Sequence, residues 1–306
     1  MGHDQLFKEF LRAFLPDFLE LFWPDAAVRL NFGTLRFLDK ELFTDFPEGS
    51  QREADVVAQV ETVDGEPEIL LVHIEVQAER ERNFEARMFQ YFTLLWLRYR
   101  LPVFPIVVYL RGDGGLSRES YRIELLGREV VRFHYDSVSL GSLEAERYVR
   151  AGSPVGSALA ALMEREDRTA PSLRALILRA IARSGLDEAR KFLLLNLVET
   201  YFALAPQAAV AFEQLLAQTE YLEEVREMEV TWADKMREEG REQGLRAGLL
   251  EGKREDLLAL LTLKFGELPP DVVARVKAMG STSELDACLA RILSARSIHD
   301  VGLADS

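Results

Sequence analysis

Two acidic residues inside strand-like, apolar sequence constrain this chain more than any other feature. Asp55 begins one β-branched stretch, and Glu75 lies within another, two residues before Gln77. Charged side chains are rarely placed inside apolar strands unless a partner or a metal ion compensates for the lost hydration. We therefore take Asp55, Glu75 and Gln77 as the candidate catalytic residues.

The spacing of the two stretches predicts a β-hairpin. Residues 52–60 and 69–77 are rich in β-branched side chains, and the turn residues Asp, Gly and Pro occur between them. If the hairpin closes symmetrically about Gly65, Asp55 lies directly opposite Glu75, with Cβ atoms about 4.5–5.5 Å apart. An even-numbered loop would put the carboxylates on opposite faces, but Pro67 favours a longer odd loop because it lacks a ladder donor.

Side chains alternate between the two faces of a strand. Within residues 69–77, one face would hold four purely apolar side chains and meet the core. The other face would hold Leu71, His73, Glu75 and Gln77. A half-exposed sheet face carrying ordinary surface acids is the simpler alternative to a functional site.

A close carboxylate pair points to a bound cation. Two carboxylates at this separation repel each other unless a positive charge lies between them. Mg²⁺ or Mn²⁺, which prefer oxygen ligands, would fit such a pair. The chain has one cysteine and four dispersed histidines, which argues against a zinc cluster and, with no disulfide possible, favours a cytoplasmic protein.

Hydrophobic periodicity predicts a chain in three parts. A core of mixed strands and helices over residues 1–141 would be followed by a helical region over 142–230 and by a glycine-repeat helix with a small helical module over 231–306. The elements expected in the core are helices at 4–22, interrupted by Pro16, and 79–100, and strands at 29–38, 52–60, 69–77, 102–110, 121–126 and 129–135. Ala-Pro pairs at 170–171 and 205–206 predict helix boundaries.

Glycine recurs at every fourth position in the third part, at Gly240, Gly244, Gly248 and Gly252. Small residues at this spacing let helix backbones approach closely. Each glycine costs about 1 kcal/mol relative to alanine in a helix, a cost that a partner helix could offset. The repeat therefore predicts a homo-oligomer formed through residues 240–252, with a frayed linker helix as the alternative.

The net charge of −14 and the pI of about 4.9 argue against general affinity for nucleic acid. DNA-binding surfaces are usually basic. An acidic enzyme can still act on DNA through a local basic cleft, with a divalent ion bridging to phosphate. Because no apolar run approaches the length of about 20 residues that spans a bilayer, we expect no membrane partner.

The order of several short motifs resembles the PD-(D/E)XK nuclease superfamily, and more narrowly the Rpn-type recombination-promoting nucleases and putative transposases. The resemblance covers roughly residues 1–140. The matching motifs are His3-Asp4-x-x-Phe7-Lys8, Arg52-x-x-Asp55, Ile74-Glu75-Val76-Gln77 and Arg87-x-x-x-Tyr91.

The resemblance implies an α/β fold, with a restriction-endonuclease-like mixed sheet flanked by helices and followed by a mostly helical C-terminal half. It implies that Mg²⁺ (or Mn²⁺) is held by Asp55, Glu75 and the Val76 carbonyl, and that the activity is hydrolysis of DNA by an endonuclease. Gln77 departs from the family pattern, which commonly has lysine there.

Three further residues are candidates for contact with the DNA substrate. Arg52 belongs to the second motif, and Arg87 and Tyr91 lie one helical turn apart on the same side of a predicted helix. A solvated arginine and a half-buried tyrosine are the simpler interpretation of the last two.

Two other functions remain open at the level of the sequence. A catalytically weak or inactive nuclease fold could serve as an interaction or oligomerisation scaffold, which the acidic pI, Gln77 and the long helical C-terminal half favour. A transposase with an RNase H-like fold would need a third carboxylate far along the chain, and the sequence marks none in a convincing context.

Overall fold

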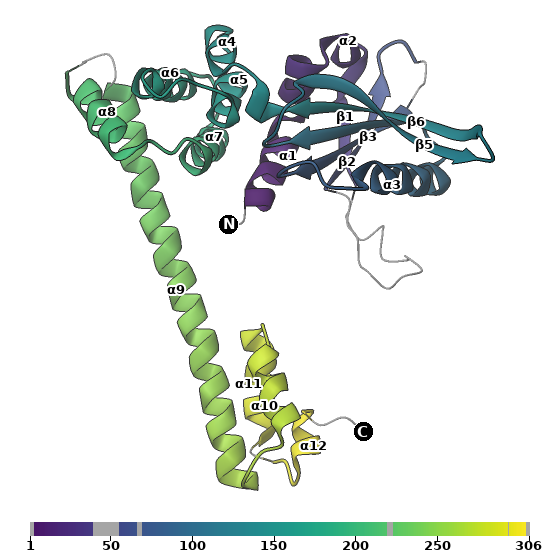
Figure 1. Cartoon of the computed structure of the whole chain (residues 1–306). Helices are drawn as coiled ribbons and strands as arrows, with labels where there is room; N and C mark the ends of the chain where they lie inside the picture. Colours follow the sequence, from purple (N-terminus) through teal and green to yellow (C-terminus); the bar gives the residue numbers. More distant parts are fainter. Residues whose placement is uncertain (1–2, 39–54, 66–68, 219–222, 293, 304–306) are drawn as a thin grey trace. The chain divides into compact units, whose positions relative to one another are not determined.

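The computed structural model describes residues 3–38, 55–65, 69–218, 223–292 and 294–303 (Figure 1). The chain forms two compact units, Met1–Glu229 and Val230–Ser306. The first unit contains a six-stranded mixed sheet with helices, and the second is helical. The sequence prediction of a mixed α/β fold with a helical C-terminal half is confirmed at this level.

The sheet of the first unit has the strand order β1-β2-β3-β4-β6-β5. Strand β3 runs parallel to β4, and β4 runs parallel to β6, whereas the other neighbouring pairs are antiparallel. The strands are β1 (Leu30–Phe37), β2 (Val56–Thr62), β3 (Ile69–Gln77), β4 (Val103–Tyr109), β5 (Leu116–Leu125) and β6 (Arg128–Ser139).

Two long helices pack against this sheet. Helix α1 (His3–Phe22) contacts β2 and β3, and its apolar stripe is almost completely buried. The helix is kinked at Phe14, two residues before Pro16, as expected for a proline inside a helix. Helix α3 (Phe84–Tyr99) lies along one face of the sheet (Figure 1), where Tyr91 and Leu95 pack with Leu71.

Strand β3 is buried on both faces, so the simpler alternative of a half-exposed sheet face carrying ordinary surface acids is not found. Leu71 and His73 are as inaccessible to solvent as Val72 and Ile74 on the other face. The reason is the parallel pairing of β3 with β4 in the middle of the sheet, where helices cover both faces.

The second long helix begins later than predicted. The expected start was residue 79, but α3 begins at Phe84. Asn83 has a φ of 62°, in the left-handed region, so an α-helix cannot run through this residue. Residues 78–83 instead form a loop directly after the candidate site.

The helices that follow the sheet belong to the first unit. Two of them, α5 (Pro154–Leu159) and α7 (Glu188–Tyr201), contact α1, so the predicted regions 1–141 and 142–230 lie together in one compact unit. Pro171 and Pro206 stand in the first turns of α6 and α8, which confirms the predicted boundaries. The other short elements of this unit are α2 (Pro24–Ala27), η2 (Leu140–Ser142), α4 (Ala145–Arg150), α5 (Pro154–Leu159), η3 (Ala160–Leu162), α6 (Ala170–Ala182), α7 (Glu188–Tyr201) and α8 (Pro206–Gln218).

Helix α9 (Glu223–Phe265) carries the glycine repeat and leads into α10 (Pro270–Ala278), α11 (Thr282–Ile292) and α12 (Ile298–Val301). A small core around Leu257, Leu261 and Cys288 holds the second unit together. A Cβ added at any glycine of the repeat would meet no atom within 4 Å in the described part of the chain. Self-association through this repeat stays a prediction.

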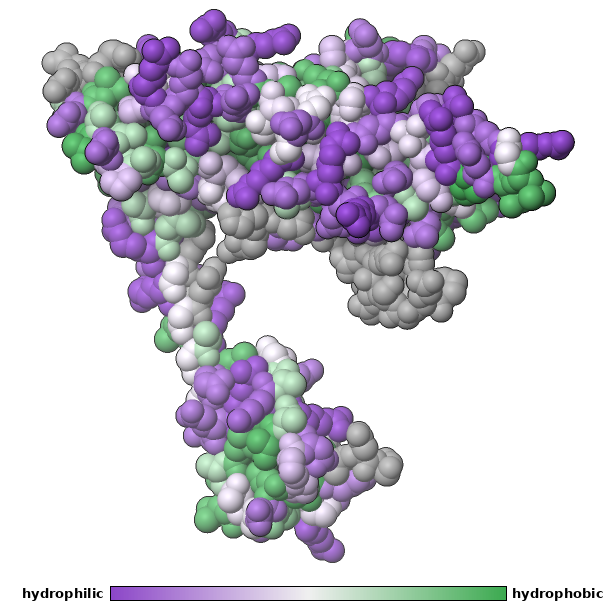
Figure 2. Space-filling view, in the orientation of Figure 1, coloured by the Kyte–Doolittle hydropathy of each residue, from purple (hydrophilic) through white to green (hydrophobic). Residues whose placement is uncertain are grey.

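Hydrophilic side chains cover much of the visible surface of the first unit, and hydrophobic ones gather at the turn end of the β5–β6 hairpin (Figure 2). Leu125, Leu126 and Val130 are exposed there. Among the described residues, none of the helices combines the length and the apolar character needed to cross a membrane.

Candidate functional site

The β2–β3 hairpin has the predicted register. Val56 pairs with Ile74 and Val57 pairs with His73, so the pairing is symmetric about residue 65. Asp55 directly precedes β2 and therefore faces Glu75. The backbone N–H of Asp55 donates a hydrogen bond to Glu75 Oε1 at 3.1 Å.

Both carboxylates are buried and hydrogen-bonded. Asp55 Oδ2 accepts a hydrogen bond from the Val76 backbone N–H at 2.8 Å, and Asp55 Oδ1 lies 2.6 Å from Lys8 Nζ. Glu75 Oε1 lies 2.9 Å from His73 Nε2. The two acids are thus held by one cation, one imidazole and two backbone donors.

Lys8 is a site residue that sequence reasoning did not single out. It lies on α1 and belongs to the first motif of the family resemblance. The signal was its place in the helical pattern, three residues before Leu11 and seven before Leu15, which are fully buried. A lysine on the apolar side of a helix needs a buried partner.

The electrostatics of the pair favour a bound cation. Burial, and then the charge of Glu75, raise the pKa of Asp55 to about 6, and its contacts with Lys8 and Val76 only partly oppose this rise. A further positive charge beside Asp55 would lower that pKa again. Ionising Asp55 in the folded chain therefore costs free energy, and a bound cation would offset part of that cost.

The carboxylates open into a pocket of about 330 Å³. It lies where β3 ends and the loop to α3 begins. Besides the two acids, the pocket is lined by Val76, Gln77, Ala78, Glu81, Arg87 and Tyr91. The structure thus brings together Asp55, Glu75, Val76, Gln77, Arg87 and Tyr91, whereas Arg52 lies outside the described residues.

Both polar atoms of the Gln77 side-chain amide are hydrogen-bonded. Its Nε2 donates to the Val76 carbonyl at 2.9 Å, and its Oε1 accepts from Arg87 Nη2 at 2.9 Å. Arg87 Nη1 in turn donates to Glu81 Oε2 at 3.1 Å, and its guanidinium lies 4.7 Å from the centre of the Phe84 ring. Arg87 therefore brings a guanidinium group to the Gln77 amide, on the side of the pocket that α3 lines.

Tyr91 is almost fully buried, and its ring meets the His73 ring edge-on at 5.7 Å between centroids. It forms one wall of the pocket beside the imidazole that contacts Glu75. Tyr91 lies one turn after Arg87 on the same side of α3, as predicted. It is more deeply buried than the half-buried tyrosine of the simpler interpretation.

The oxygen atoms present suit a hard cation such as Mg²⁺ or Mn²⁺ better than zinc or copper. No group of three or more His, Cys, Asp or Glu side chains in the described part of the chain is arranged to hold a metal. Asp55, Glu75 and the Val76 carbonyl offer two carboxylates and one carbonyl. This set fits Mg²⁺, which binds proteins through one or two carboxylates and keeps several waters.

Function has to be inferred from the chemistry of this pocket. Comparison with known proteins found no family model, no curated protein and no solved structure that matches the chain.

Proposed function

We propose that this chain is a Mg²⁺-dependent DNA endonuclease of the PD-(D/E)XK type. The observation that carries the proposal is the pair of buried carboxylates facing each other across the β2–β3 hairpin, in a pocket open to solvent. A sheet flanked by α1 and α3 supports it, because the family resemblance implies such an arrangement.

In this proposal Asp55, Glu75 and the Val76 carbonyl hold Mg²⁺. The ion, when bound, would supply the positive charge that activates water and stabilises the transition state of phosphodiester hydrolysis. The remaining residues orient the substrate. Arg87, held by Glu81 and Gln77, presents its guanidinium to a phosphate oxygen from the α3 side of the pocket.

Gln77 has a positioning role here. Its amide is neutral and cannot replace the lysine charge of the family pattern. Its Nε2 and Oε1 instead link the Val76 carbonyl to Arg87. The amide thereby aligns a proposed metal ligand, the carbonyl, with a proposed phosphate ligand, Arg87. Lys8 adds a second positive charge next to Asp55 from the α1 side.

Cleavage of supercoiled plasmid DNA tests the proposal. The wild-type chain is compared with Asp55→Ala and Glu75→Ala in Mg²⁺, Mn²⁺ or EDTA, at low salt. Asp17→Ala is the matched control, because Asp17 is an exposed acid on α1. We expect metal-dependent nicking by the wild type and the control, and none by the two pocket variants. Nicking that survives both pocket substitutions would sink the assignment.

One observation favours a second candidate, a non-catalytic interaction protein on the same fold. Lys8, His73 and two backbone N–H groups contact three of the four carboxylate oxygens, so protein groups already compensate much of the charge of the pair. Calorimetric titration with Mn²⁺ separates the candidates. Saturable heat that disappears in Asp55→Ala supports the nuclease, and no heat from the folded wild type supports the interaction protein.

A further inference from the structure

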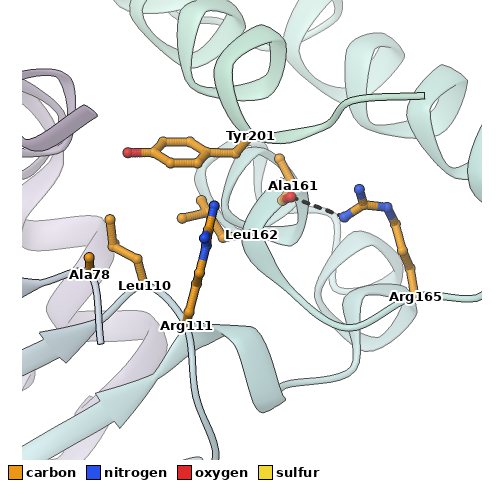
Figure 3. Close-up of a pocket in the computed structure, with 7 residues that line it drawn as sticks. All are labelled: Ala78, Leu110, Arg111, Ala161, Leu162, Arg165 and Tyr201. Carbon is orange, nitrogen blue, oxygen red and sulfur yellow. Dashed lines mark hydrogen bonds between the residues drawn. The ribbon is translucent and has the colours of Figure 1, made fainter. Parts of the chain in front are cut away.

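A second cavity, of about 300 Å³, lies beside the candidate metal pocket, and Ala78 lines both. Figure 3 shows its walls. Two arginines, Arg111 and Arg165, face it together with Tyr201 and two leucines. The cavity belongs to none of the sites described above.

Its location is set by the ends of two parallel strands. Ala78 directly follows β3, and Leu110 and Arg111 directly follow β4. Arg111 N donates to the Ala78 carbonyl at 3.0 Å, which continues the β3–β4 pairing beyond the strands. Crevices at the carboxyl ends of parallel strands are where α/β sheets usually bind ligands.

The backbone of Arg111 is held closely from a second side. A Cβ added at Gly141, in η2, would lie 3.1 Å from Arg111 Cα. Only glycine permits this approach without a shift of the neighbour. The side chain of Arg111 then extends from the end of β4 toward Tyr201 across the cavity (Figure 3).

Arg165 approaches the cavity from the helical side. Its Nη1 donates to the Ala161 carbonyl at 3.1 Å, and its guanidinium stacks 3.9 Å from the centre of the Phe202 ring. Burial lowers the pKa of Arg165 from its ordinary value. The charge is thus kept in a partly dehydrated place, where an anion would interact with it more strongly than in water.

The cavity is positive in a strongly acidic chain. No carboxylate lines it, and among the described residues none lies within ion-pair distance of Arg111 or Arg165; the charge of Asp167 acts on Arg165 from further away and only partly opposes the effect of burial on its pKa. Many other arginines of the chain pair with acids, for example Arg118 with Asp136 and Arg183 with Glu224. With 51 acidic residues against 37 basic ones, two arginines without a carboxylate in one cavity indicate a site for an external anion.

We propose that this cavity binds a phosphate group of the nucleic-acid strand whose neighbouring phosphodiester lies in the Asp55–Glu75 pocket. The inference rests on the proposed function and extends it. Arg111 provides the fork-shaped donor that suits a phosphate, Arg165 provides the background charge, and Leu110 and Leu162 offer apolar contact to the sugar or base. A free nucleotide would offer the same phosphate chemistry.

Fluorescence anisotropy in EDTA tests binding without cleavage. The probe is a short, labelled single-stranded DNA, and deoxythymidine monophosphate is the unlabelled competitor. The variant is Arg111→Ala, which keeps the backbone hydrogen bond to Ala78, and Arg111→Lys restores the charge. Arg128→Ala is the matched control, because Arg128 is an exposed arginine at the far end of the β5–β6 hairpin (Figure 1).

We expect Arg111→Ala to weaken binding of the DNA about tenfold, the size of one charge-assisted hydrogen bond. The slope of log affinity against log salt should fall by about 0.7, as for one lost phosphate contact on a single strand. Arg111→Lys should recover part of the affinity, and Arg128→Ala should match the wild type.

Two results would overturn the proposal. One is wild-type affinity and salt dependence for DNA in Arg111→Ala; if competition by the nucleotide is lost in that variant at the same time, the cavity is a free-nucleotide site. The other is no binding of DNA by the wild type in EDTA. The proposed nuclease fails by a different result, plasmid cleavage that survives both Asp55→Ala and Glu75→Ala, so the two failures can be told apart.

Discussion

Replacing Asp55 by asparagine should make the chain more stable at neutral pH while removing its proposed metal site. Asparagine keeps the shape of the side chain and carries no charge. The buried carboxylate, by contrast, has its pKa raised from 3.8 to about 6 by burial and by the charge of Glu75. The ionised carboxylate of Asp55 therefore lowers the free energy of unfolding of the wild type at neutral pH.

The size of the effect follows from the pKa. The folded chain holds the Asp55 proton more tightly than the unfolded chain does, so binding of this proton stabilises the folded state. The stabilisation is complete below pH 3.8 and is lost as the pH rises through about 6. The difference amounts to about 3 kcal/mol. That figure already includes the attraction of Lys8. The asparagine amide has only one acceptor for the two donors at this side chain, Lys8 Nζ and the Val76 N–H, so we expect a smaller net gain in the free energy of unfolding, about 1–2 kcal/mol at neutral pH.

Urea denaturation monitored by circular dichroism measures the free energy of unfolding of both chains near pH 7.5 and pH 4.5. The advantage of Asp55→Asn should shrink at the lower pH, where wild-type Asp55 is protonated. Asp17→Asn, at an exposed position on α1, controls for the loss of one negative charge. An Asp55→Asn chain that is less stable than the wild type near pH 7.5, or a gain equal at both pH values, would refute the reasoning.

Mg²⁺ adds a second readout to the same experiment. A ligand that binds only the folded chain stabilises it by about 1.4 kcal/mol at a concentration ten times its Kd. Mg²⁺ should therefore stabilise the wild type and leave Asp55→Asn unchanged, so that the difference between the two chains narrows. Equal stabilisation of both would place the ion elsewhere.

Two further predictions concern arginines. Arg87→Ala frees Gln77 Oε1 and removes the proposed phosphate contact, so plasmid cleavage should slow by about tenfold or more while calorimetric affinity for Mn²⁺ stays within a factor of about two of the wild type; an equal loss of both would contradict the assigned role. Arg174→Ala leaves Glu199 and Glu229 without their shared buried partner, and burial already raises the pKa of Glu229 to about 6. The chain should lose about 3 kcal/mol of stability in urea denaturation near pH 8 and less near pH 5, where Glu229 takes up a proton; a loss independent of pH would show that packing alone is responsible.

The sequence predicted the local geometry of the site well. The register of the β2–β3 hairpin depends on two strands and the turn between them, which are close in the chain, and the expected pairing of Asp55 with Glu75 was confirmed. The spacing of Arg87 and Tyr91 likewise placed both at the pocket once α3 had formed. Strand propensity, turn residues and helical periodicity act over a few residues and can be read directly.

Contacts between distant parts of the chain escaped the sequence analysis. Burial of His73 and Glu75 requires β4, which follows β3 only after a whole helix, to pair in parallel with it. The ion pair of Lys8 with Asp55 joins α1 to the start of β2. The cavity of Arg111 and Arg165 needs the helical region to pack beside the sheet, whereas the sequence around Arg111 indicated only the end of a strand.

The acidic composition and the proposed nuclease are compatible because charge acts over short distances in salt. At physiological ionic strength, interactions between exposed charges are screened beyond about 8 Å. With Mg²⁺ compensating Asp55 and Glu75, a bound strand would meet the positive charges of Lys8, Arg87 and Arg111 around the ends of β3 and β4 before it met the net charge of −14. The distant acids still slow the approach of DNA at low salt, where screening is weak. Affinity should therefore fall less steeply with added salt than for a basic protein with the same phosphate contacts, since salt weakens repulsion and attraction together.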